Sequence, residues 1–157
     1  AYNLYACSGL LFNHESPLRP LRFVTRKIIN SACLIANGKT DLLKLGNVNI
    51  VRDWGWAPEY VRAMYLMLQQ EKAQDYVIAT GKSISLEEFI KLTFEYFNLN
   101  YKNHIEIDSS FYRPTDIPFG LGNPGKAASQ LNWKVKYYVE DVIKKMIENE
   151  IQLLKKS

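Results

Sequence analysis

Apolar residues occur along the chain partly in short continuous runs and partly at helical spacing, a pattern typical of mixed α/β proteins. The first run, Asn3 to Phe12, predicts a strand buried on both faces, as in a parallel sheet. Parallel neighbours require crossover connections, so we expect that further strands precede this one in a longer protein. Shorter strands are predicted at 42–45, 49–53, 75–80 and 104–107.

Helical spacing of apolar residues predicts five helices, at 23–36, 58–70, 85–97, 124–131 and 138–154. The first should end at Asn37-Gly38, and the third opens with the capping box Ser85-Leu86-Glu87-Glu88. Asn123 is the expected cap of the fourth. In the second helix one face is apolar and is expected to be buried; its residues are Val61, Met64, Tyr65 and Leu68.

Composition places the chain among ordinary globular proteins, with 47% hydrophobic and 23% charged residues. No apolar run approaches the length of a bilayer span, and no signal peptide is visible, so we expect a soluble cytoplasmic protein without membrane contact. Two isolated cysteines and two histidines predict no metal site.

Positive charge is concentrated in one part of the chain. Between Ser16 and Thr40 there are five cations and no acid, while the whole chain has a net charge of +4. The excess is therefore a local patch, whereas nucleic-acid binders usually spread theirs over a longer face, so no nucleic-acid partner is expected.

The start of the first long helix is the strongest candidate site. Thr25-Arg26-Lys27 places two cations where they oppose the helix dipole, an arrangement that is unfavourable unless an anion lies between them. Free backbone N–H groups together with Arg and Lys side chains can bind a diphosphate, although a solvated basic turn has the same pattern.

Other motifs are weaker. Arg52 follows a strand and could reach a phosphate, and Arg113 is held beside Pro114 in an extended loop, with Asp116 available for sugar hydroxyls. The stretch from Gly120 to Lys126 matches a phosphate-binding loop only superficially, because Pro124 lacks a donor N–H. It predicts a turn before a short helix. Spacing alone reveals no catalytic set.

Several segments resemble the GDP-mannose 4,6-dehydratase family of extended short-chain dehydrogenases/reductases. The most specific are Asn13-His14-Glu15-Ser16-Pro17 and Val24-Thr25-Arg26-Lys27. The similarity continues through Arg52-Asp53-Trp54-Gly55, Tyr112-Arg113-Pro114 and Gly122-Asn123-Pro124-Gly125-Lys126-Ala127, and covers nearly the whole chain. The implied fold is the last part of a Rossmann sheet followed by the small substrate-binding α/β domain.

The resemblance also implies a function. Family members oxidise GDP-mannose at C4 with bound NADP, eliminate water across C5–C6 and return the hydride to C6, which gives GDP-4-keto-6-deoxymannose, a precursor of fucose. It implies that His14 and Arg19 lie near the NADP, and that GDP-sugar is bound by Asn13, Thr25, Lys27, Arg52, Arg113 and Asp116. The family assembles as dimers or tetramers, so a homo-oligomer is expected for the complete enzyme.

The chain departs from the family pattern at several positions, two of which concern the expected ligand contacts. Leu18 replaces an arginine usual in the family, and Asp116 replaces a longer acid. The family's Gly-rich cofactor loop and its Thr, Glu and Tyr-x-x-x-Lys groups would precede residue 1, so we expect residues 1–157 to be a C-terminal nucleotide-sugar-binding portion without catalytic residues. The alternatives are a sister GDP-sugar reductase or epimerase and a non-catalytic nucleotide-sugar-binding module.

Overall fold

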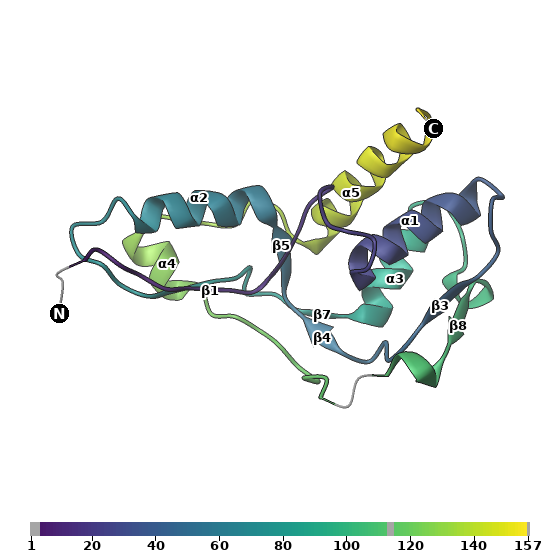
Figure 1. Ribbon diagram of the computed structural model, residues 1–157, viewed down its shortest axis with the longest axis horizontal. Coiled ribbons are helices and arrows are strands. Elements are labelled where there is room, and N and C mark those ends of the chain that lie inside the picture. Colours follow the sequence, from purple (N-terminus) through teal and green to yellow (C-terminus); the bar gives the residue numbers. More distant parts are fainter. Residues whose placement is uncertain (1–3, 113–114, 157) are drawn as a thin grey trace.

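The computed structural model describes residues 4–112 and 115–156. Within them the chain forms an elongated α/β molecule with two parts, which meet near strand β5 (Trp54–Trp56) (Figure 1). One part contains α2 and α4, and the other contains α1, α3 and α5. Each part has its own cluster of buried hydrophobic residues.

The helices agree closely with those predicted. They are α1 (Val24–Ala36), α2 (Ala57–Met67), α3 (Leu86–Glu95), α4 (Gly125–Gln130) and α5 (Val139–Leu154), with short 3₁₀ turns η1 (Tyr101–Asn103) and η2 (Ser109–Phe111). The remaining strands are β1 (Gly9–Leu11), β2 (Asn13–Glu15), β3 (Leu43–Leu45), β4 (Val51–Arg52), β6 (Tyr76–Ile78), β7 (Ile84–Ser85) and β8 (Ile105–Ile107).

The strands pair in twos. Three pairs are parallel, β1 with β6, β2 with β5 and β3 with β8, whereas β4 and β7 are antiparallel. Phe119 adds a parallel bridge to Val51, so the segment after residue 115 runs beside β4. Parallel pairing of strands from distant parts of the chain is the arrangement expected of an α/β fold, and that prediction is confirmed.

Local sequence signals explain the ends of the helices. The Ser85 hydroxyl accepts a hydrogen bond from the Glu88 N–H at 3.0 Å, which confirms the predicted cap of α3. Helix α1 ends before Gly38, which has φ +65° and so adopts the left-handed conformation that glycine tolerates best. The Asn123 side chain accepts from the Gly125 N–H at 2.9 Å, although the residue that directly precedes α4 is Pro124.

Two burial predictions were wrong. The strand predicted from Asn3, a residue outside the described part, is short and largely exposed, with Leu10 54% exposed, because β6 is its only sheet partner in the described chain. In α2 the predicted core face is the exposed one: Val61 is 61% exposed, whereas Tyr60, Ala63 and Met67 pack against β6 and α4. Both faces of α2 contain apolar residues, so periodicity alone did not identify the buried face.

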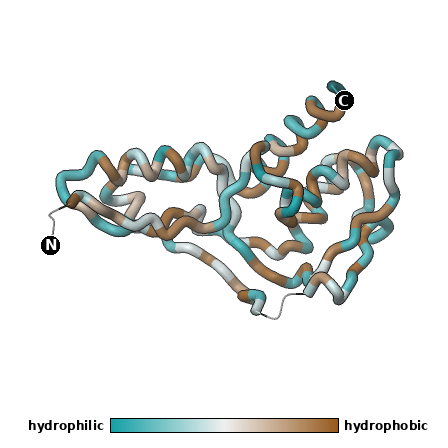
Figure 2. The backbone as a smooth tube through the Cα atoms, in the orientation of Figure 1, coloured by the Kyte–Doolittle hydropathy of each residue, from teal (hydrophilic) through white to brown (hydrophobic). Residues whose placement is uncertain are grey.

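Helix α5 closes the larger part by packing against α1 and α3 (Figure 1). Hydrophobic and hydrophilic residues alternate along it (Figure 2), and the apolar side, including Val142, Met146 and Ile147, is buried. In the described residues no helix has both the length and the apolar character needed to span a membrane.

The glycine-rich segment before α4 is a packing turn, as predicted. A Cβ at Gly122 would lie 2.1 Å from the Ala79 Cβ, so this glycine allows the segment to lie directly against the end of β6. Lys126 donates to the Asp75 carbonyl at 2.8 Å. Its ammonium group therefore contacts the backbone of the fold itself.

Candidate functional site

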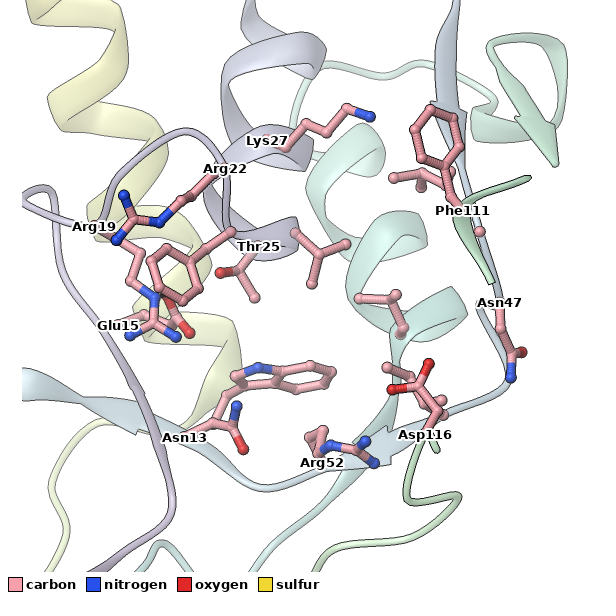
Figure 3. Close-up of a pocket in the computed structure, with 17 residues that line it drawn as sticks. Asn13, Glu15, Arg19, Arg22, Thr25, Lys27, Asn47, Arg52, Phe111 and Asp116 are labelled. Atoms are coloured by element: carbon pink, nitrogen blue, oxygen red, sulfur yellow. Dashed lines mark ion pairs between the residues drawn. The ribbon is translucent and has the colours of Figure 1, made fainter. Parts of the chain in front are cut away.

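A cavity of about 430 Å³ opens at the start of α1, between β2, β4 and the loop that follows β3 (Figure 3). It contains six of the eight residues proposed above for ligand contact: Asn13, Arg19, Thr25, Lys27, Arg52 and Asp116. These residues are separated by up to about a hundred positions in the sequence. The fold therefore gathers most of the predicted site into one pocket.

The N-terminus of α1 forms one wall of this pocket. Its first turn contains no acidic residue, and the residue before it, Phe23, makes no side-chain hydrogen bond to the helix. The first backbone N–H groups of this 13-residue helix thus remain available for a ligand. Phe23, Val24 and Thr25 all line the cavity, so this positive end of the helix dipole faces the place where a ligand would lie.

Two cations of the pocket are fixed by backbone carbonyls. The Lys27 ammonium donates to the Lys44 carbonyl at 2.7 Å and lies 5.0 Å from the centre of the Phe111 ring. Arg52 Nη1 donates to the Val51 carbonyl at 2.8 Å. Each has further N–H groups, so both can bind an anion without giving up these contacts.

Arg26 does not contribute to the pocket, which corrects the expectation that Thr25-Arg26-Lys27 act together. Its side chain turns into the core and pairs with Glu150 of α5, which also accepts a hydrogen bond from Asn30 at 2.6 Å. Consecutive helix residues point about 100° apart, so neighbouring cations need not serve the same site. Arg26 is 6% exposed and Glu150 is 3% exposed.

His14 is not a lining residue of the pocket, because alternate residues of a strand point to opposite faces. Asn13 and Glu15 line the cavity, whereas the His14 ring stacks on Tyr60 with centroids 4.8 Å apart. His14 Nδ1 lies 2.8 Å from the Phe12 carbonyl oxygen, which can only accept, so Nδ1 donates and, in the neutral ring, Nε2 is left as an acceptor. Gly55 permits this stack, because a Cβ there would lie 2.4 Å from the Tyr60 ring.

Glu15 is an acidic residue that lines the pocket beside Arg19. It is 1% exposed, and one carboxylate oxygen lies 3.3 Å from Arg19 Nε. Burial raises the pKa of Glu15, while the Arg19 charge and the Thr25 hydroxyl act in the opposite direction. Arg19 also lies over the Phe23 ring, 3.8 Å from its centre, so this arginine is held on two sides.

Sequence reasoning missed several lining residues. Of the residues that were predicted, Asp116 reaches the pocket despite its short side chain, and Arg113 lies outside the described residues. The additional lining residues include Glu15, Phe23, Asn47, Trp54 and Phe111. The alternation with Asn13 could have identified Glu15, whereas Asn47 and Phe111 depend on loop packing. Phe111 approaches so closely that a Cβ at Gly46 would lie 2.8 Å from its carbonyl oxygen.

The floor of the site is braced by a buried carboxylate. Asp53, which is 0% exposed, accepts hydrogen bonds from the Thr80 N–H at 2.9 Å, the Thr80 hydroxyl at 2.7 Å and the Gly81 N–H at 2.9 Å. Asp53 lies between Arg52 and Trp54, both of which line the pocket. It therefore fixes their backbone relative to the end of β6. The described residues contain no cluster of three or more metal-ligating side chains.

Comparison with known proteins gives a consistent family. Residues 1–146 match the family model described as GDP-mannose 4,6 dehydratase. The chain is 48% identical over 156 residues to GDP-mannose 4,6 dehydratase 1 of Arabidopsis thaliana, covering 99% of this chain and 43% of the relative. It is 44% identical to the protein of the same name from Dictyostelium discoideum, covering 99% and 48%. The chain thus spans less than half the length of these relatives.

Solved structures show the same fold at lower identity. RMD from Pseudomonas aeruginosa, complexed with NADPH, superimposes with a TM-score of 0.85 at 16% identity, over 95% of this chain and 49% of that chain. dTDP-glucose 4,6-dehydratase from Bacillus anthracis, in complex with NAD, gives 0.84 at 16% identity, over 98% and 47%. The fold expected for part of an extended short-chain dehydrogenase/reductase is thereby confirmed.

Proposed function

Because this chain belongs to the GDP-mannose 4,6-dehydratase family, we propose that it is the nucleotide-sugar-binding portion of an enzyme that converts GDP-mannose to GDP-4-keto-6-deoxymannose. The observation that carries the proposal is the pocket at the start of α1. There an acid-free helix N-terminus, Lys27 and Arg52 converge on one cavity large enough for a ligand.

The geometry suggests a role for each group. The diphosphate lies against the first N–H groups of α1, where Lys27 and Arg52 neutralise its charge. Asn13 and Thr25 have side chains that can bond to sugar hydroxyls, and Asp116 can accept from ribose or base. Arg113 is proposed as a further phosphate ligand on the basis of the family motif alone.

The residues proposed for the cofactor have suitable chemistry for NADP. His14 presents Nε2 as an acceptor for a hydroxyl or amide N–H, and Arg19 presents Nη groups for a phosphate. When bound, NADP would accept the hydride that leaves C4 and, as NADPH, would return it to C6. Because Arg19 lines the same pocket as the substrate candidates, we propose that the two ligands meet along β2.

The complete protein is proposed to contain the reacting groups outside these 157 residues. The family's Gly-rich cofactor loop and its Thr, Glu and Tyr-x-x-x-Lys groups have no counterpart here, and no residue of this chain is assigned to proton transfer. For the complete enzyme we further propose a dimer or tetramer, located in the cytoplasm, whose product leads to fucose-type sugars.

Replacement of Lys27 tests the binding proposal. Lys27→Ala and Arg113→Ala should each weaken GDP binding to the full 157-residue chain by roughly 1–3 kcal/mol, because each removes a charged hydrogen-bond donor. Isothermal titration calorimetry measures the change directly. A thermal unfolding curve of each variant separates lost binding from lost folding.

Lys39→Ala is the matched control. Lys39 belongs to the same basic segment and its loss changes the net charge equally, but it is exposed beyond the end of α1 and does not line the pocket. We expect the affinity of the Lys39→Ala variant for GDP to stay close to that of the unmodified chain. Equal affinities of all variants and the unmodified chain would refute the assignment of the pocket.

A further inference from the structure

Glu15 is placed where a carboxylate is unfavourable in the ligand-free protein. Both of its oxygens and Arg19 Nε are buried, and the two groups that face the carboxylate, Arg19 and the Thr25 hydroxyl, form no hydrogen bond of normal geometry with it. A buried carboxylate with a single imperfect ion pair costs stability. A buried polar group left in this state requires an explanation.

The explanation lies in how Glu15 and Phe23 hold Arg19. The carboxylate lies 3.3 Å from the Nε edge of the guanidinium, and the Phe23 ring covers one face at 3.8 Å. No hydrogen bond to the two Nη groups is formed by any described residue, and the Arg19 side chain is 26% exposed in the cavity wall. The Nε edge of the guanidinium is thus held and buried, whereas the two Nη groups keep their donors; Figure 3 shows Arg19 beside Glu15 in the wall of the pocket.

We propose that Glu15 is a positioning residue, which holds Arg19 so that its two Nη groups face a phosphate of a bound ligand. A fixed arginine fork binds a phosphate with less loss of side-chain freedom than a mobile one. Glu15 itself is 1% exposed, so its proposed role is exerted through Arg19 and not through a contact of its own with the ligand. This inference rests on the proposed function, since it requires a phosphate ligand in the pocket.

The stability of the protein tests whether the Glu15 carboxylate is unfavourable in the folded chain. Burial raises the pKa of Glu15 against the opposing effects of the two groups that face it, Arg19 and the Thr25 hydroxyl. The folded state therefore binds this proton more tightly than the unfolded state, and its stability falls as pH rises through the raised pKa. Glu15→Gln should accordingly match or exceed the unmodified chain in stability at neutral pH, with the advantage vanishing below about pH 4.3.

Although Glu15→Gln should not lower the stability of the protein at neutral pH, we expect it to weaken ligand binding. Glu15→Gln removes the charge that holds Arg19, so the arginine side chain regains freedom that it must lose again when the ligand binds. The substitution also removes the repulsion between the Glu15 carboxylate and the ligand phosphate. We expect the first effect to be the larger, because the pocket is open to solvent and ions screen that repulsion. We expect affinity for the Arg19 ligand to fall by about 5- to 10-fold, as for loss of one ordering contact. GDP and NADPH are titrated separately, because either phosphate ligand could be the partner of Arg19.

A double-mutant cycle with Arg19→Ala completes the test. For whichever ligand Arg19→Ala weakens, Glu15→Gln should weaken binding in the unmodified chain and have no effect in the Arg19→Ala background. Unchanged or tighter binding by Glu15→Gln, an equal loss in both backgrounds, or no effect of Arg19→Ala on either ligand would overturn the proposal. Failure of the unmodified chain to bind GDP would instead contradict the proposed function.

Discussion

At the scale of single residues, the pocket depends on side chains with few alternatives. Lys27 and Arg52 are each tied to a carbonyl and still present donors to the cavity. Arg19 is fixed by a carboxylate and a ring. A cation that is held in place loses less entropy on binding than a freely moving one, which favours selective recognition over general attraction of anions.

Asp53 is the residue whose loss should damage the site without touching a ligand. Asp53→Ala removes the acceptor of three hydrogen bonds and leaves the buried Thr80 donors and the part-buried Gly81 N–H unpaired, so we expect the free energy of unfolding to fall by about 3 kcal/mol. Urea unfolding followed by tryptophan fluorescence measures the change. Asp75→Ala is the control, since Asp75 also accepts a backbone N–H, at Ser8, but on the exposed surface. Equal effects of both substitutions would argue against the bracing role.

The sequence predicted individual pocket residues well where a family motif or strand alternation applied. Asn13, Thr25, Lys27, Arg52 and Asp116 were placed in one site from the motifs, and the structure gathers them. Arg26 was expected at the same site, but its side chain is buried and pairs with Glu150, which lies 124 residues away along the chain. A contact at that separation has no local sequence signal.

At the scale of elements, the helices were easier to predict than the strands. Capping at Ser85 and the apolar stripe of α5 are local signals, and both are confirmed. The first strand and the apolar face of α2 depend on which neighbours cover them, so their burial could not be derived from periodicity. The same limit applies to Phe111, which reaches the pocket through loop packing.

Helix α5 is joined by a buried ion pair to α1, the helix whose N-terminus lines the pocket. Glu150→Ala would leave Arg26 charged and unpaired in the core, and we expect it to lower the free energy of unfolding by about 3–5 kcal/mol. Chemical denaturation gives the magnitude, and hydrogen exchange should show the loss of protection concentrated in α1 and α5.

Glu148→Ala provides the comparison on the same helix. Glu148 is exposed, and its removal changes the charge identically without uncovering a buried partner, so its effect should stay within about 0.5 kcal/mol. A destabilisation by Glu150→Ala no larger than that of Glu148→Ala would show that the pair does not anchor α5.

At the scale of the whole molecule, the pocket lies in the part built from α1, α3 and α5, close to where the two parts meet. Strand β2 brings Asn13 and Glu15 to the pocket on one face and His14 to Tyr60 on the other, where it joins the second part. The two faces of this short strand therefore contact different parts of the molecule, the pocket on one side and Tyr60 of α2 on the other.

A structure of the chain bound to GDP tests the central claim most directly. We predict that the linked phosphates lie against the first turn of α1, within hydrogen-bond distance of its free N–H groups and of Lys27. A complex in which GDP lies elsewhere, with the Lys27 ammonium still directed to solvent and to Lys44, would contradict it.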